Sequence, residues 1–291
     1  MFLKNITILL RPHQYIKNLF VFAPLMFSFQ VIGGGNEVLN SLVAFLLFSL
    51  IASSIYILND YMDIEEDRKH PVKKFRPLAS GFISKSQAKV LFVSLSISVL
   101  FIACMFNIQL FYVLLVYFIL NIAYSIKLKH ISIVDIFIIS LGFVLRLFAG
   151  SVVTGIELSH WIIIITFLLA LFLALAKRRD DVMLSQAGKE TRKNIDGYNF
   201  EFVNATMVLM AGVIIVSYIL YTVSSDVINK LHTNNLYITT FFVILGIFRY
   251  MQLAFVEQKS GSPTKIVLKD RFLQFTILFW LLSFYIVVKV V

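Results

Sequence analysis

Residues 38–67 read VLNSLVAFLLFSLIASSIYILNDYMDIEED, an uncharged run that ends abruptly in carboxylates. The run from Val38 to Asn59 is long enough to cross a membrane as a helix, which takes about 20 mainly apolar residues. At roughly 100° per residue, four side chains at its end share one helix face: Asn59, Asp60, Asp63 and Asp67. The stretch therefore predicts a membrane helix whose end carries a polar site.

Three carboxylates on one face repel each other unless a cation lies between them. Mg²⁺ takes oxygen ligands and usually shares its coordination shell with substrate phosphates, so it is the cofactor that this spacing favours. The bases that follow suit phosphates directly; they are Arg68, Lys69, Lys73, Lys74 and Arg76. The competing interpretation is an ordinary cytoplasmic loop of mixed charge beside a membrane.

Composition identifies an integral membrane protein. Of the 291 residues, 59% are hydrophobic and 14% are charged, whereas soluble domains have about 45–50% apolar and about 25% charged residues. No charge-rich block is long enough to form a soluble domain, so residues 1–291 are predicted to form a single transmembrane domain. The single cysteine, Cys104, lies in an apolar run, which excludes disulfides and a zinc site.

Nine candidate spans follow from the apolar runs, and helices are expected because the runs are too long and too uniformly apolar for barrel strands. The uncharged run 90–126 is too long for one span, and Asn107 with Gln109 marks a turn inside it. The predicted fold is therefore all-α, with nine transmembrane helices. The expected spans are 18–32, 38–59, two within 90–126, 131–155, 160–176, 202–224, 236–256 and 272–288.

Basic residues set the expected orientation. They gather before the first span and in every second loop, whereas the opposite loops contain only Lys230, with Lys289 at the far terminus. This asymmetry predicts a multi-pass protein of the plasma membrane with its N-terminus in the cytoplasm and its C-terminus outside. The net charge of +10 then lies mainly on the cytoplasmic side.

Polar groups recur at one membrane depth, where the second and sixth spans end in charged clusters and the fourth ends near Tyr124. The recurrence predicts one cavity open to the cytoplasm and lined by several helices. Tyr124 is either part of that cavity or an aromatic residue of the membrane interface. Lys17, just before the first span, either binds a phosphate or reaches to the interface.

Arg146 lies near the middle of the fifth span, where a charged side chain is costly and usually faces a cavity and a partner. Asp135 is on nearly the same helix face but about 16 Å away along the axis, so the two are not expected to pair. Two accounts stay open for Arg146. It points into the cavity, or it forms a buried salt bridge with another helix.

The sixth span runs into Lys177-Arg-Arg-Asp-Asp181. Lys177, Arg178 and Asp181 would share one helix face, which suits either a membrane anchor or a site. The acids and the further bases at 189, 192 and 193 favour a site. Because cations exceed anions in the predicted cavity, its ligands are expected to carry several negative charges, as phosphates do, while the reacting partner comes from the lipid phase.

Residues 59–67, as NDxxDxxxD after an apolar helix, resemble the first acidic motif of the UbiA superfamily of intramembrane prenyltransferases. With RPHQxxKN at 11–18 and HPxKxxRP at 70–77, the pattern is similar to one branch, the decaprenyl-phosphate phosphoribosyltransferases. The resemblance spans nearly the whole chain. Further matching positions are Lys177, Arg178, Arg179, Arg192, Lys193, Tyr198, Asp270 and Arg271.

The resemblance implies nine helices around a cytoplasmic cavity and Mg²⁺-dependent transfer of a phosphoribosyl group from phosphoribosyl pyrophosphate to a polyprenyl phosphate, for a cell-envelope polysaccharide precursor. It implies that Asp60, Asp63 and Asp67 are catalytic and hold Mg²⁺ together with Asn59. Phosphate oxygens would be bound by Lys73, Arg76, Lys177 and Arg178. Lys17 and Arg146 would contact the lipid phosphate or the far side of the sugar substrate.

One departure from the wider superfamily is informative. Users of prenyl diphosphates carry a second Asp-x-x-x-Asp cluster after the sixth span, whereas residues 177–181 here are basic first. More cations suit a reaction that brings together a 5-phosphate, a diphosphate and an acceptor phosphate.

Two other functions are kept as alternatives. One is UbiA-type prenyl transfer to an aromatic or other acceptor. The other is a transporter or channel, against which the short and nearly uncharged external loops argue. Membrane lipids are expected partners and a homo-oligomer is left open. Nucleic acid is not expected, because no soluble domain presents the basic residues.

Overall fold

The computed structural model describes residues 2–28, 35–69, 72–186 and 197–289, and these residues form helices and loops without a strand. Eight helices are long and apolar enough to cross a membrane, which confirms an all-α, multi-pass membrane protein. Each lies on one of the predicted spans. They are α3 (Gly35–Met62), α5 (Lys85–Phe106), α6 (Ile108–Ile126), α7 (Val134–Thr154), α8 (His160–Gln186), α9 (Phe200–Val223), α11 (Thr240–Phe255, preceded by the 3₁₀ helix η6, Leu236–Thr239) and α13 (Arg271–Lys289).

The first predicted span has a different form. After α1 (Phe2–Leu10), the chain forms an 11-residue 3₁₀ helix, η1 (Pro12–Phe22), and then the short helix α2 (Ala23–Ser28). At about 2.0 Å per residue, η1 covers roughly 22 Å, and α2 adds roughly 9 Å. The two together match the thickness of a hydrocarbon core, about 30 Å, so this segment is the ninth candidate span. Residues 29–32, the end of the predicted span, lie outside the described residues.

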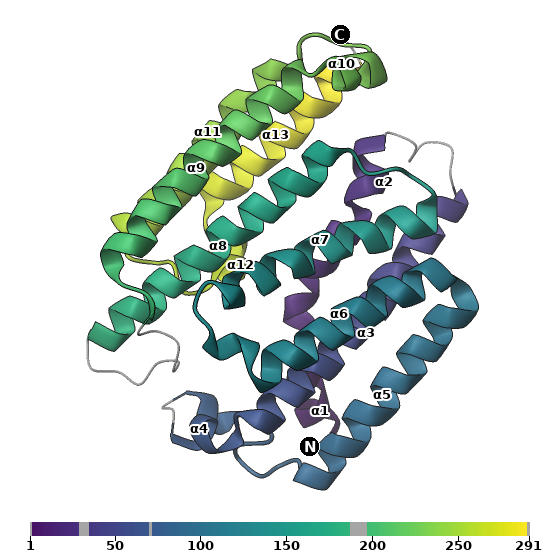
Figure 1. Cartoon of the computed structure of the whole chain (residues 1–291), viewed down its shortest axis with the longest axis vertical. Helices are drawn as coiled ribbons and strands as arrows, with labels where there is room; N and C mark the ends of the chain where they lie inside the picture. Colours follow the sequence, from purple (N-terminus) through teal and green to yellow (C-terminus); the bar gives the residue numbers. More distant parts are fainter. Residues whose placement is uncertain (1, 29–34, 70–71, 187–196, 290–291) are drawn as a thin grey trace. The chain divides into compact units, whose positions relative to one another are not determined.

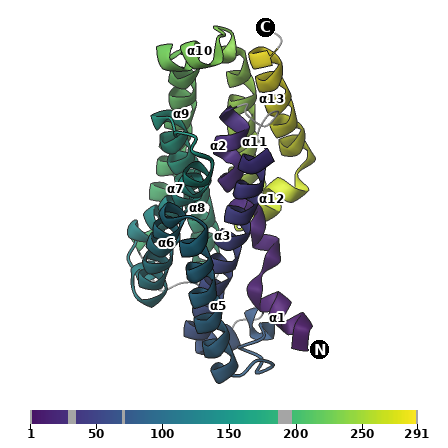
Figure 2. The same cartoon turned by 90° about the vertical axis from the view of Figure 1, so that its right-hand side faces the viewer.

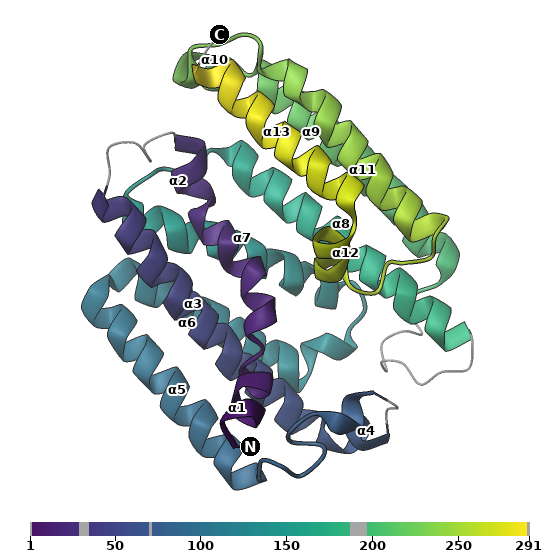
Figure 3. The same ribbon diagram turned by 180° about the vertical axis from the view of Figure 1, so that it is seen from behind.

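The chain divides into two compact units, residues 1–158 and 159–291, and each is described by itself. In the first unit, α3 is the central helix and packs against α5, α6, α7 and η1 (Figure 1). The path of α1, η1 and α2 runs along α3 and α7 (Figure 3). The smaller elements of this unit are α4 (Ile64–Lys69), η3 (Lys73–Phe75) and η4 (Leu128–His130).

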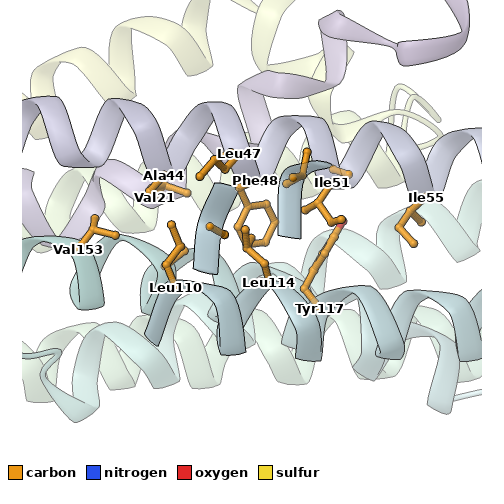
Figure 4. Packing of buried hydrophobic residues seen from close by; sticks show 14 residues of the cluster. Val21, Ala44, Leu47, Phe48, Ile51, Ile55, Leu110, Leu114, Tyr117 and Val153 are labelled. Carbon is orange, nitrogen blue, oxygen red and sulfur yellow. The ribbon is translucent and has the colours of Figure 1, made fainter. Parts of the chain in front are cut away.

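The core of the first unit lies between α3, α5, α6 and α7 (Figure 4). Phe48 of α3 is fully buried and packs against Tyr117 of α6, with ring centroids 4.6 Å apart. Alanines at 44, 52 and 103 are also buried here. Small residues let membrane helices approach closely, because helix association in lipid depends on packing rather than on the hydrophobic effect.

Local sequence explains where the helices of the first unit begin and end. Ser84 and Gln87 form a reciprocal capping box at the start of α5. Asn107 breaks the long apolar run as predicted, because its side chain accepts a hydrogen bond from the Leu110 backbone N–H and so starts α6. Gly155 ends α7 with φ of 69°, a conformation that glycine adopts without strain.

In the second unit, α8 packs against α9, and α11 packs against α13. Helix α10 (Ser225–Leu231) lies across the end of α9 (Figure 2), and α12 (Pro263–Lys269) leads into α13 and contacts α8. The Tyr218 hydroxyl accepts a hydrogen bond from Trp280 Nε1 at 2.8 Å and is 2.8 Å from Thr239 Oγ1. This network ties α9, η6 and α13 together.

Candidate functional site

The acidic motif lies where α3 passes into α4. Although Asp63 separates the two helices, the backbone N–H of Asp63 bonds to the Asn59 carbonyl at 3.0 Å, and that of Asp67 bonds to the Asp63 carbonyl at 2.8 Å. The helical register therefore continues through the motif. Asp60 and Asp67 are almost fully buried, at 2% and 3% exposure.

Arginine side chains neutralise the two buried carboxylates. Arg76 Nη1 donates to Asp60 Oδ1 at 3.0 Å and to Asp67 Oδ2 at 2.6 Å. Arg11 Nη2 donates to the same Asp60 oxygen. Two acids and two bases thus form one charge-balanced cluster, built from three separate stretches of the chain.

Arg11 reaches this cluster because of its backbone conformation. It has φ of 54° and ψ of 56°, in the left-handed region, at the turn between α1 and η1. Its guanidinium also lies over the Tyr56 ring, 5.2 Å from the centroid. Arg11 belongs to the family-like motif, but sequence reasoning did not place it in the site.

Asp63 is paired with Lys129, whose Nζ is 2.5 Å from Asp63 Oδ1. Lys129 lies on η4, between α6 and α7, and is 66 residues away in sequence. In the sequence, Lys129 is one of the basic residues in the alternate loops that set the expected orientation. No local pattern could have assigned it to the acidic motif.

The arrangement of the three motif aspartates can be compared with the ligand set that Mg²⁺ requires. Within the described ranges, no three His, Cys, Asp or Glu side chains are grouped closely enough to hold a metal ion. Asp60 and Asp67, however, contact the same Arg76 nitrogen, so one cation can contact both. Mg²⁺ typically needs only one or two carboxylates besides water and substrate phosphates. The donor set fits Mg²⁺ in that form, and a third ligand from Asp63 stays a prediction.

Arg146 is buried within the first unit, at 5% exposure. Its Nε donates to Asn18 Oδ1 at 2.8 Å and its Nη1 donates to the Gly142 carbonyl at 2.6 Å. Its guanidinium also lies 4.8 Å from the ring centroid of Phe48 and 5.4 Å from that of Tyr117. Among the described residues, its partners are an amide, a carbonyl and aromatic rings, so a salt bridge to another helix is not formed there.

The side chains of η1 meet those of α3 at matching intervals along the two helices. Three residues of a 3₁₀ helix and four of an α-helix both rise about 6 Å. Tyr15 and Asn18 therefore meet Ser53 and Ser49, with hydrogen bonds of 2.9 Å in both pairs. Asn18 thus links η1 to α3 and, through Arg146, to α7.

The remaining predicted site residues of the first unit are half-buried: Lys17 on η1, Asn59 on α3, Lys73 on η3 and Tyr124 near the end of α6. Lys17 has Arg11 and Arg146 as neighbouring charges. His70 and Pro71 of the motif lie outside the described residues. The predicted cytoplasmic cavity stays a prediction.

In the second unit, α8 continues ten residues beyond the predicted span, so the basic cluster is helical. Arg178 is fully buried and pairs with Asp181, three residues later, as their shared helix face predicts. Arg179 Nε donates to Asn204 Oδ1 at 2.9 Å and its Nη1 donates to the Ala254 carbonyl at 2.6 Å. Lys177 is half-buried, and the bases at 189, 192 and 193 lie outside the described residues.

Arg249 of α11 and Asp270, which directly precedes α13, are partners. Arg249 Nη2 is 2.6 Å from Asp270 Oδ2, and Asp270 Oδ1 accepts the Leu273 backbone N–H at 2.8 Å. The hydrogen bond from Arg249 holds the pKa of the Asp270 carboxyl below its usual range. Asp270 therefore both starts α13 and fastens it to α11.

The fold and site together define a multi-pass membrane protein with a buried acidic motif at the end of a membrane helix. The chain belongs to the UbiA prenyltransferase family, whose family model matches residues 21–280. This confirms the resemblance seen in the sequence.

Its relatives include the decaprenyl-phosphate phosphoribosyltransferase of Mycolicibacterium smegmatis, 34% identical over 93% of this chain and 88% of that protein. The protein of the same name from Mycobacterium tuberculosis is 32% identical over 94% of this chain and 90% of its own length. Among solved structures, a UbiA homolog from Archaeoglobus fulgidus bound to DMAPP and Mg²⁺ superimposes with a TM-score of 0.74 at 18% identity, covering 99% of this chain and 100% of that one. That likeness shows a shared fold.

Proposed function

We propose that the protein transfers the 5-phosphoribosyl group of phosphoribosyl pyrophosphate to a polyprenyl phosphate and releases pyrophosphate, in the synthesis of a cell-envelope polysaccharide precursor. The observation that carries the proposal is the cluster at Asp60, where carboxylates suited to a metal lie beside cations suited to phosphates. The activity for which the two mycobacterial relatives are named supports the same assignment.

In this reaction, a phosphate oxygen of the lipid forms a bond with the anomeric carbon of the ribose, while the bond from that carbon to pyrophosphate breaks. The attacking oxygen is already ionised near pH 7, so no general base is needed. Rate enhancement would come mainly from positioning and charge stabilisation. Bound Mg²⁺ would supply charge neutralisation for the departing pyrophosphate.

Residue roles follow from the same proposal. Asp60, Asp63 and Asp67, with Asn59, would hold Mg²⁺, and Asp67 and Asp60 are the pair best placed to share it. Four side chains are assigned to phosphate oxygens: Lys73, Arg76, Lys177 and Arg178. Lys17 is assigned to the lipid phosphate or the far side of the sugar substrate, as is Arg146, and Tyr124 to the substrate cavity. The observed contacts of Arg146 also support a role in holding η1, which carries Lys17.

We further propose a plasma-membrane location with the N-terminus in the cytoplasm and the C-terminus outside, because basic residues are concentrated in alternate loops. The nine spans would surround a cavity open to the cytoplasm, which would bring phosphoribosyl pyrophosphate and membrane lipid together. A homo-oligomer is compatible with this arrangement.

Prenyl transfer from a prenyl diphosphate to another acceptor is the second candidate, because it is the activity for which the family is named. One experiment separates the two. The purified protein is incubated with Mg²⁺, radiolabelled phosphoribosyl pyrophosphate and a polyprenyl phosphate, and the lipid phase is extracted. We expect label in the lipid, its loss with EDTA, and its return when Mg²⁺ is restored. No label, together with turnover of a prenyl diphosphate, would overturn the first proposal.

A further inference from the structure

The cluster around Asp60 is balanced in charge without a metal. Asp60 and Asp67 supply two negative charges, and Arg11 and Arg76 supply two positive charges. Both carboxylates are nearly inaccessible to solvent, so their charges are weakly screened and depend on these partners. A divalent cation added alone would leave the cluster with an excess of two positive charges.

Arg76 occupies the place that a shared metal would need. One nitrogen, Nη1, contacts one oxygen of each carboxylate. A cation bridging Asp60 and Asp67 would therefore have to displace this guanidinium group. Two cations cannot both fill that position, because their mutual repulsion is strong away from water.

The two arginines differ in their freedom to move. Arg11 is fixed by the turn at its own backbone and by contact with the Tyr56 ring. Arg76 follows the three-residue helix η3 on an extended backbone, and its side chain is 29% exposed, slightly more than the 22% of Arg11. Arg76 is thus the partner that can turn outward, and a guanidinium suits phosphate oxygens as well as carboxylates.

We propose that Arg76 is an internal counter-cation that fills the metal position between Asp60 and Asp67 and moves to the phosphates when a pyrophosphate-bearing substrate arrives with its metal. This inference rests on the proposed function for the identities of the metal and of the phosphate ligand. Its consequence is positive coupling. The metal binds weakly alone, and the metal and pyrophosphate each increase the affinity for the other, by the same factor.

Metal binding to the purified full-length protein tests this directly. Equilibrium dialysis with Mn²⁺ as the probe is carried out with and without inorganic pyrophosphate, and the protein-free chamber reports the unbound metal. Without pyrophosphate, Arg76→Gln should bind Mn²⁺ roughly 5- to 150-fold more tightly than the wild type. When pyrophosphate is added, the affinity of the wild type for Mn²⁺ should rise by a similar factor. The affinity of Arg76→Gln for Mn²⁺ should rise much less.

Two further variants serve as controls. Arg76→Lys keeps the positive charge and should bind Mn²⁺ as weakly as the wild type. Lys85→Gln removes the charge of a side chain that is 59% exposed and pairs with Glu65 rather than with Asp60 or Asp67, so Mn²⁺ binding should not change in this variant.

The proposal is overturned if Arg76→Gln binds Mn²⁺ no more tightly than the wild type when pyrophosphate is absent. If that variant fails to fold, the wild type still decides, because Mn²⁺ affinity that is indifferent to pyrophosphate would also overturn it. The dialysis contains no sugar or lipid substrate. Failure of phosphoribosyl transfer with coupling intact would therefore refute the proposed reaction and leave the role of Arg76 standing.

Discussion

Asp63 is the most exposed of the three motif aspartates, with a side chain 31% exposed and Lys129 as its partner. Replacing it with Asn removes one negative charge at nearly constant size. Asn keeps a side-chain oxygen that can accept a hydrogen bond from Lys129, so we expect Asp63→Asn to stay folded with only a small fall in its apparent unfolding temperature. We expect it to lose roughly 10²- to 10³-fold in transfer rate, as when a charge-stabilising group is removed.

The matched control is Glu65→Gln, two residues further along, where the carboxylate is 70% exposed and pairs with Arg68 and Lys85. It should transfer at the wild-type rate. Full activity in Asp63→Asn would refute a metal-binding role for this aspartate.

Arg146 offers a second test at the scale of a single residue. In Arg146→Gln, the side-chain oxygen Oδ1 of Asn18 loses the buried donor that Arg146 supplies. Leaving this acceptor unpaired should lower the free energy of unfolding by on the order of 1–3 kcal/mol. Thermal unfolding in detergent should show this loss. A double variant with Asn18→Ala should be less destabilised than the sum of the two single changes, because both changes remove the same contact. Additive effects would mean that the two residues act independently.

Sequence reasoning at this scale succeeded where partners follow one another on a helix. Arg178, for example, pairs with Asp181 three residues later on the same face. It could not identify Arg11 and Lys129 as partners of the acidic motif, because the aspartates that they contact are 49 and 66 residues away in sequence. Those contacts depend on how α1 and η4 fold back on α3, which no local spacing encodes.

At the scale of elements, η1 depends on a close approach to α7 at Gly150. A methyl group there would overlap the Val21 carbonyl oxygen and crowd Pro24. Gly150→Ala should therefore displace η1, cost about 1–3 kcal/mol as overpacking does, and lower the transfer rate because Lys17 lies on η1. Apparent unfolding temperature and transfer rate are both measured.

Gly212 on α9 is the control for this change, because nothing lies within 4 Å of a methyl group added there. Gly212→Ala should be neutral or slightly stabilising, since alanine favours a helix by about 1 kcal/mol over glycine. Equal behaviour of the two variants would show that the approach of η1 to α7 is unimportant.

The start of α13 depends on Asp270, whose carboxyl has a lowered pKa because of its hydrogen bond from Arg249. A lowered pKa means that the stabilisation is complete above the ordinary Asp range, near 3.9, and is lost as pH falls through the lower folded value. Asp270→Asn keeps a helix-capping oxygen but removes the charge, so its unfolding temperature should change less than that of the wild type as pH falls from 6 to about 3. Asp270→Ala should be less stable by a further 1 kcal/mol or so, because it also loses the cap. Parallel pH curves for wild type and Asp270→Asn would contradict this.

The 3₁₀ conformation of η1 could not be predicted from the sequence. An apolar run shows that a segment can lie in an apolar environment and is long enough to cross it. It does not distinguish a 3₁₀ helix from an α-helix. The tighter helix here follows from Pro12 at its start and from the matching 6 Å repeats that join it to α3. The eight long helices were predictable because their apolar runs satisfy the length requirement on their own.

For the whole molecule, the family model extends from residue 21 to residue 280 and so includes most of both compact units. The acidic motif belongs to the first unit, and the Lys177–Asp181 cluster belongs to the second. Composition was sufficient to predict an all-α membrane protein. It could not reveal that the acids would be neutralised within their own unit, because that requires Arg11, Arg76 and Lys129 to converge from three different segments.

The choice between phosphoribosyl and prenyl transfer is best made by direct competition. Protein in vesicles that contain a polyprenyl phosphate is given Mg²⁺, phosphoribosyl pyrophosphate and a prenyl diphosphate together, and the lipid products are identified by mass spectrometry. We predict a polyprenyl phosphate that has gained one phosphoribosyl group, formed together with an equal amount of pyrophosphate and absent in Asp63→Asn. A product that has gained a prenyl group, with phosphoribosyl pyrophosphate left unconsumed, would contradict the proposed function.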